Sequence, residues 1–148
     1  MVRYVRWIYV GWLGLTAAAI VLQFYLAGYA VFGFTGLNGF ETHLVLGGLI
    51  VLASVIGIAL AFAARVPWRI TGINGAFFVL MVVQGMLAHV PVRALSALHV
   101  VNGVLVFGVT LYLLRESTRW ARREMEPPPV SRVGTRSEVM PARQSAKR

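Results

Sequence analysis

The chain has 148 residues, of which 58% are hydrophobic and 13% charged, with no cysteine and a formal net charge of +9. An ordinary soluble domain has about 45–50% apolar and about 25% charged residues, so this composition excludes that class. The lack of cysteine excludes disulfides, thiolate-bound zinc, iron–sulfur clusters and covalently attached c-type haem. The positive charge could indicate nucleic acid, but its distribution along the chain favours a membrane protein without nucleic-acid partners.

Four long apolar stretches divide the chain. They cover residues 7–30, 43–64, 70–88 and 94–114. Each is close to the roughly 20 residues that a helix needs to cross a bilayer. The connections at 65–69 and 89–93 leave room only for tight turns. Residues 1–120 are therefore predicted to form an all-α, integral membrane, up-down-up-down four-helix bundle.

The basic residues predict how this bundle sits in the membrane. Thirteen of the 14 lysines and arginines fall on one side of the predicted spans, and only Arg93 falls on the other. The positive-inside rule then puts both termini in the cytoplasm and the protein in a bacterial cytoplasmic (inner) membrane. Residues 7–30 are longer than the apolar region of a cleaved signal peptide, which has about 7–15 residues. The basic, proline-containing segment 121–148 is predicted to be a disordered cytoplasmic tail attracted to anionic lipid.

Two short motifs occur twice in the same order. Gln-x-x-Leu-Ala lies at 23–27 and 84–88, and His-x-x-x-Gly lies at 43–47 and 99–103. Each glutamine motif is near the outer end of an outward-running helix, and each histidine motif begins an inward-running one. The arrangement predicts a duplicated two-helix unit. Chance recurrence is the alternative, because Leu, Ala and Gly are common in this chain.

His43 and His99 are the ionisable residues inside the spans, where such groups are costly and usually functional. In a four-helix bundle the second and fourth helices run parallel on a diagonal, with axes about 12–14 Å apart. That separation suits two imidazoles with a porphyrin between them. We therefore predict that both histidines bind the iron of one non-covalent b-type haem. Gly47 and Gly103, one turn further on, are predicted to leave space for the macrocycle. The alternative is two hydrogen-bonded structural histidines beside small-residue packing seams.

Other polar residues have competing interpretations. Arg93 could pair with a haem propionate or be an ordinary loop arginine. Glu41 follows Asn38 at the spacing of a helix-capping box, and no function is assigned to the interfacial His89. Four amides are expected to form interhelical hydrogen bonds: Gln23, Asn74, Gln84 and Asn102. Two methionines are expected to fill the core rather than bind iron: Met81 and Met86.

These motifs support two resemblances. Through Gln23, His43 with Gly47, Gln84 and His99, residues 3–115 resemble a bacterial family of small four-helix membrane proteins described only as a domain of unknown function. The chain also resembles one half of haem A synthase, whose bundles hold haem between histidines. That family has Glu-x-x-His-Arg where this chain has Glu-Thr-His-Leu at 41–44. The resemblance therefore implies haem binding without implying the family's oxygenase chemistry.

Three functions follow as hypotheses. The first is a small b-type cytochrome that transfers electrons or senses redox state, with a membrane redox partner or quinone. The second is a cofactor-free membrane accessory or interaction protein. The third is a haem-modifying enzyme related to haem A synthase. A homo-oligomer is a further expectation for the assembled protein.

Overall fold

The computed structural model describes residues 2–33 and 38–123, apart from the side chain of Arg93. Most of this part of the chain is helical. The helices are α1 (Val2–Val31), α2 (Gly39–Ala63), α3 (Trp68–Ala88), the single turn α4 (Arg93–Ser96) and α5 (Leu98–Arg123). Four spans are long and apolar enough to cross a membrane, as predicted; α4 and α5 together make the fourth, Ala94–Arg123.

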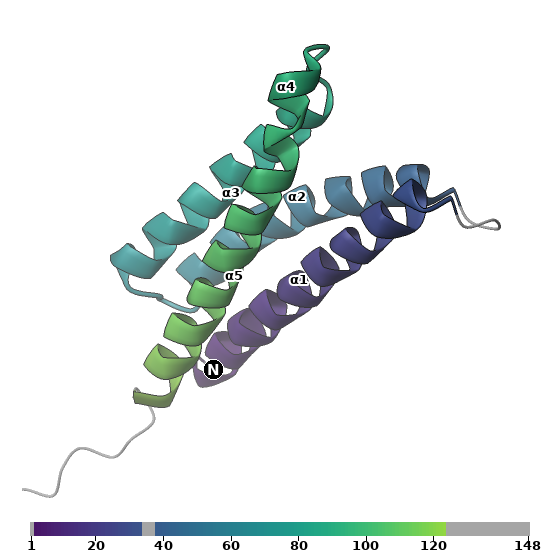
Figure 1. Ribbon diagram of the computed structural model, residues 1–148. Helices are drawn as coiled ribbons and strands as arrows, with labels where there is room; N and C mark the ends of the chain where they lie inside the picture. The colour runs from purple at the N-terminus through teal and green to yellow at the C-terminus, as the bar shows by residue number, and fades with distance from the viewer. Residues whose placement is uncertain (1, 34–37, 124–148) are drawn as a thin grey trace, which may run out of the picture.

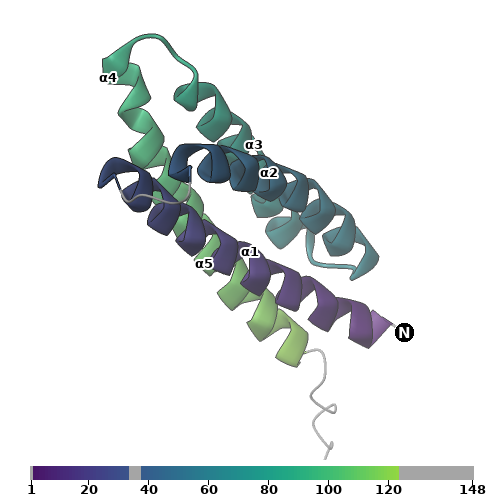
Figure 2. The ribbon, with the colours of Figure 1, turned by 90° about the vertical axis from the view of Figure 1, so that its right-hand side faces the viewer.

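The helices form two hairpins, α1–α2 and α3–α5 (Figures 1 and 2). Helix α1 packs against α2 and α5, and α3 packs against α2 and α5, so α2 and α5 lie on a diagonal. We call the end with Val2, Trp68 and Arg123 the terminal end. The opposite end, with Gly39 and Ala88, is the histidine end. The hairpins diverge from the terminal end toward the histidine end (Figure 1).

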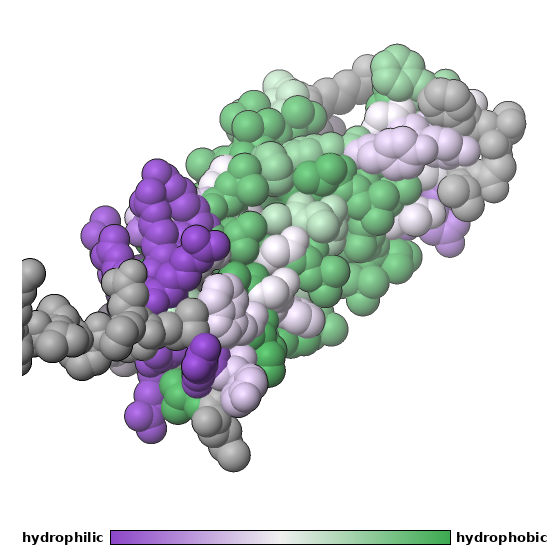
Figure 3. Space-filling view, turned by 90° about the horizontal axis from the view of Figure 1, so that it is seen from below, coloured by the Kyte–Doolittle hydropathy of each residue, from purple (hydrophilic) through white to green (hydrophobic). Residues whose placement is uncertain are grey.

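The surface of the bundle is apolar over most of its length. Only 22–33% of the most apolar window of each span is buried inside the protein. Large apolar side chains such as Leu44, Leu52 and Val104 are more than half exposed. Figure 3 shows a hydrophobic middle zone with hydrophilic residues gathered near the terminal end. A helix that is apolar on all sides is stable outside a protein core only in lipid, so these faces contact the bilayer.

All four long helices contribute large side chains to the core. Leu13 and Ile20 of α1 pack with Ile50 of α2, Phe77 and Met81 of α3, and Val106 and Leu113 of α5. Met81 therefore fills the core as predicted, whereas Met86 is exposed. Near the histidine end, the rings of Phe24 and Phe107 meet edge to face at 5.8 Å and join the two hairpins.

Local sequence signals explain two helix ends. The Asn38 side chain accepts a hydrogen bond from the Glu41 backbone N–H at 3.2 Å, which confirms the predicted cap of α2. At the other end of α2, Arg65 has a positive φ of 58°. The N–H of Arg65 donates to the carbonyl of Phe62, and that of Val66 donates to Ala61. These two bonds form a Schellman motif that reverses the chain into α3.

The start of the first helix and the end of the last helix differ most from the prediction. Helix α1 begins at Val2, five residues before the predicted span, because amphipathic residues such as Tyr4 continue the helix beyond the apolar stretch. Helix α5 continues to Arg123, so residues 121–123, predicted to be tail, are helical. Ala121 is buried and holds this last turn on the bundle. Residues 124–148 of the predicted tail lie outside the described part of the chain.

Candidate functional site

The structure brings His43 and His99 together. Their ring centroids are 6.1 Å apart and their planes are inclined at 57°. His43 lies in the second turn of α2 and His99 is the second residue of α5. Both side chains are half-buried. Because α2 and α5 are the diagonal pair, the two imidazoles connect the two hairpins across the bundle.

Each imidazole is held by a carbonyl group of the other helix in its own hairpin. The Nδ1 of His43 is 3.1 Å from the backbone oxygen of Gln23, and the Nδ1 of His99 is 3.0 Å from that of Gln84. A carbonyl oxygen can only accept, so Nδ1 must donate in both contacts. In the neutral ring this leaves the lone pair on Nε2, on the side away from the hydrogen bond.

The two glutamines also fill the space beside the two glycines. The Gln23 Nε2 donates to the backbone oxygen of His43 at 2.9 Å. A Cβ atom at Gly47 would come within 2.9 Å of that nitrogen, and one at Gly103 within 3.3 Å of the Gln84 Nε2. The glycines thus accommodate glutamine amides, which differs from the predicted space for a macrocycle. Contact of Gly47 or Gly103 with a cofactor stays a prediction.

Beside its glutamine, the second hairpin has a polar residue that the first hairpin lacks. Asn102 donates through Nδ2 to the Oε1 of Gln84 at 2.6 Å and to the backbone oxygen of Leu80 at 3.0 Å. In the first hairpin the Oε1 of Gln23 is buried and has no hydrogen-bond partner among the described residues. The predicted role of Gln23, Gln84 and Asn102 as interhelical hydrogen-bonding residues is confirmed.

The donor set of this site is small. In the described part of the chain, no three His, Asp or Glu side chains gather where they could hold a metal ion. Two imidazoles bound to opposite sides of one metal, each with its nitrogen about 2 Å from the metal, have ring centroids about 6 Å apart. The observed centroid separation of 6.1 Å is close to that value. The two histidines could therefore hold a metal whose other ligands come from a macrocycle.

Three residues with open roles lie outside this histidine pair. His89 is exposed just after α3, and its Nδ1 contacts the carbonyl of Gly85 in its own helix at 2.8 Å. Glu41 accepts a hydrogen bond from the Asn38 side chain at 3.0 Å, consistent with its capping role. Arg93 begins α4, but its side chain lies outside the described residues. Its proposed pairing with a propionate stays a prediction.

A second polar cluster lies near the terminal end and was only partly foreseen. The Tyr9 hydroxyl accepts from the Asn74 Nδ2 at 2.5 Å and is 3.5 Å from the Ser117 hydroxyl. All three residues are buried. Asn74 was predicted to bond between helices, and this is confirmed. Tyr9 lies in the first apolar stretch and Ser117 lies beyond the last one, and the sequence pattern assigned neither residue a contact in the core. The buried cluster joins α1, α3 and α5 by hydrogen bonds.

Part of the chain matches a protein-family model. Residues 23–94 match a family of unknown function (DUF6220). This segment begins at Gln23 and includes His43, Gly47 and Gln84, while His99 lies beyond it. No curated protein and no solved structure matches the chain. The expected likeness to haem A synthase thus stays a prediction, and over these residues the chain is similar to a family without an assigned function.

Proposed function

We propose that this small membrane protein binds one b-type haem between His43 and His99. The observation that carries the proposal is the 6.1 Å separation of two imidazoles whose Nδ1 atoms both donate to carbonyl groups. Metal-ligating histidines usually have their second nitrogen fixed in this way, because the hydrogen bond sets the tautomer and orients the ring. Both rings are thus prepared to bind a metal through Nε2.

The chemistry of the donor set favours haem over a bare metal ion. A structural zinc site needs about four protein ligands, and a catalytic one about three. The described residues offer only two at this place. A porphyrin would supply four nitrogen ligands to its iron, and His43 and His99 would hold the iron with two more. The absence of cysteine restricts the chain to a non-covalent haem.

The residues around the histidines would position the ligands and stabilise them. The carbonyls of Gln23 and Gln84 hold the rings and increase the basicity of Nε2. The edge-to-face pair of Phe24 and Phe107 keeps the neighbouring region apolar. When bound, such a haem takes up or releases one electron at the iron. We therefore propose electron transfer or redox sensing, with a membrane redox partner or quinone as the exchanging species.

A second candidate is a cofactor-free membrane accessory protein. The observation that favours it is the filling of the sites beside Gly47 and Gly103 by the glutamine amides. In this alternative the histidines serve as structural links, each bonded to a carbonyl and packed against the other ring. Their pairing would then stabilise the bundle without any bound metal.

An absorption spectrum of the protein purified from cells supplied with haem distinguishes the two candidates. We expect a coloured protein with a low-spin b-type spectrum that sharpens on reduction. His43→Ala and His99→Ala should each severely weaken haem retention, because each removes one axial ligand. His89→Ala is the matched control, since His89 is exposed and bonded within its own helix.

The opposite result would support the cofactor-free candidate. A folded wild-type protein without haem absorption, also after incubation with free haemin, contradicts the proposal. Haem loss in His89→Ala equal to that in the other two variants would place the ligands elsewhere. Helical circular dichroism of each variant separates loss of ligand from loss of fold.

A further inference from the structure

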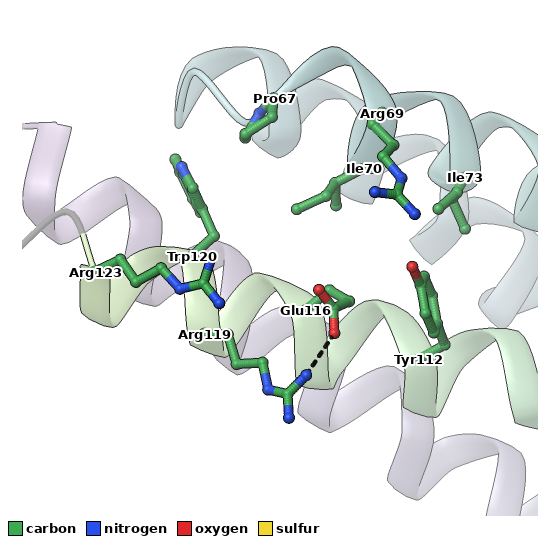
Figure 4. Close-up of a pocket in the computed structure, with 9 residues that line it drawn as sticks. All are labelled: Pro67, Arg69, Ile70, Ile73, Tyr112, Glu116, Arg119, Trp120 and Arg123. Atoms are coloured by element: carbon green, nitrogen blue, oxygen red, sulfur yellow. Dashed lines mark hydrogen bonds and ion pairs between the residues drawn. The ribbon is translucent and has the colours of Figure 1, made fainter.

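A hollow at the terminal end opens between the start of α3 and the last turns of α5 (Figure 4). Its volume is about 190 Å³. Pro67, Arg69, Ile70 and Ile73 line it from the α3 side, and Tyr112, Glu116, Arg119, Trp120 and Arg123 line it from α5. The lining combines guanidinium groups with apolar and aromatic side chains, and it is separate from the histidine pair.

The charge of this hollow is positive. Three arginines face one acid, Glu116, and that acid is already paired with Arg119 at 3.0 Å. Among the described residues neither Arg69 nor Arg123 forms an ion pair. In Figure 4 the Arg69 side chain extends from α3 between Ile70 and Ile73, on the side that faces α5. Two guanidinium groups on different helices thus line the hollow without a carboxylate partner among the described residues.

The start of α3 adds to this positive field. Pro67 precedes the helix and provides no side-chain cap, and the first turn of α3 contains no acidic residue. The uncompensated N–H groups of a first helical turn carry partial positive charge and favour phosphate. Arg69 is in this first turn, so the partial charge of the helix end adds to the positive charge of the guanidinium at this end of the hollow.

The apolar part of the lining indicates which anion fits. Ile70 and Ile73 continue from the charged end toward the hydrophobic zone of the bundle. Trp120 stands beside Pro67 in Figure 4, and the Arg6 guanidinium lies 4.8 Å from the centre of its ring. Tryptophan, tyrosine and arginine at the end of membrane spans mark the level of lipid headgroups. A soluble anion has no apolar part that could pack against the adjoining apolar side chains, whereas the acyl chains of a lipid can.

We propose that this hollow binds the phosphate headgroup of an anionic phospholipid, with the acyl chains along Ile70 and Ile73. Basic pockets between membrane helices bind such headgroups by charge and by hydrogen bonds. Arg69 and Arg123 would bind the phosphate from two helices. The lipid would then link the two helices of the second hairpin at their terminal end. This proposal does not depend on haem binding.

Native mass spectrometry of the full-length protein tests the site, with phosphatidylglycerol and phosphatidylcholine as probes. We expect one retained phosphatidylglycerol, with clear preference over phosphatidylcholine. Arg69→Gln/Arg123→Gln should weaken phosphatidylglycerol binding about tenfold or more, since each basic residue near the membrane surface adds to the attraction for an anionic headgroup. The matched control is Arg115→Gln/Arg122→Gln, which removes the same charge from exposed positions of α5 outside the hollow. It should weaken binding about twofold or less.

Two further measurements separate a built site from diffuse attraction. Glu116→Gln removes the only acid of the lining and should tighten phosphatidylglycerol binding. Equal losses in the two double variants would overturn the proposal, because the basic end as a whole would then attract the lipid. Displacement of the lipid by soluble glycerol 3-phosphate at similar concentration would assign the hollow to a free phosphate compound and overturn the lipid assignment.

Discussion

Each of the two hairpins holds one imidazole through the same set of contacts. They differ in whether the glutamine side chain has a polar partner. In both, the histidine Nδ1 meets the backbone oxygen of a glutamine on the other helix. In both, the amide of that glutamine lies over a glycine one turn beyond the histidine. In the second hairpin Asn102 donates to the glutamine side chain. Leu46 occupies the equivalent place in the first, three residues after its histidine.

The repeat preserves the contacts of the histidine rings but not those of the glutamine side-chain oxygen. The preserved part fixes the tautomer and position of each ring, which supports a shared purpose for the two histidines. The part that varies concerns the glutamine Oε1, which is bonded in one hairpin and buried without a described partner in the other. The duplicated motif predicted from sequence thus corresponds to a duplicated set of contacts.

Among the substitutions that test this difference between the hairpins, replacing Asn102 should have the largest effect on the free energy of unfolding. Asn102→Leu gives the second hairpin the residue of the first and leaves the Gln84 Oε1 without its donor. Because a lost hydrogen bond in a membrane protein costs about 1–2 kcal/mol, we expect that decrease in the free energy of unfolding. Titration with SDS in mixed micelles measures it. The exposed control Val104→Leu should be neutral, and a neutral Asn102→Leu would show that the donor is dispensable.

The two glycines should respond unequally to added side chains. Gly47→Ala places a Cβ 2.9 Å from a glutamine nitrogen, whereas Gly103→Ala leaves 3.3 Å. We expect Gly47→Ala to lower the unfolding free energy by about 1 kcal/mol, and Gly103→Ala by less. Gly48→Ala and Gly108→Ala are controls, because a Cβ there meets nothing within 4 Å. Equal stability of all four variants would contradict the close glutamine–glycine contact.

The smallest expected effect comes from giving the first hairpin the polar residue of the second. Leu46→Asn loses apolar contact, but its amide can donate to the Gln23 Oε1. It should therefore destabilise the protein less than Leu46→Ala does, by about 0.5–1 kcal/mol. This difference should vanish when Gln23 is replaced by leucine. If the difference persists in the variant with leucine at position 23, the introduced asparagine does not reach Gln23. The two hairpins then differ in side-chain geometry as well as in sequence at this position.

Much of the architecture could be predicted from sequence because it rests on strong local signals. Apolar length defined the four spans, Asn38 and Glu41 defined a helix cap, and the repeated motifs placed His43 and His99 opposite each other. The role of Gly47 and Gly103 could not be derived, because a small residue indicates close packing but not which side chain packs against it. The Tyr9–Asn74–Ser117 cluster and the basic hollow combine residues far apart in the chain, so spacing along one helix gave no indication of them.

Electron paramagnetic resonance of the ferric protein tests the central claim most directly, since it reports the number of axial ligands. We predict a low-spin signal for the wild type, with one imidazole from each hairpin. In both His43→Ala and His99→Ala, the remaining haem should be high-spin, and added imidazole should restore the low-spin signal. A wild-type protein without a haem signal, or a low-spin signal that persists in either variant, would contradict the claim that the two histidines form one haem site.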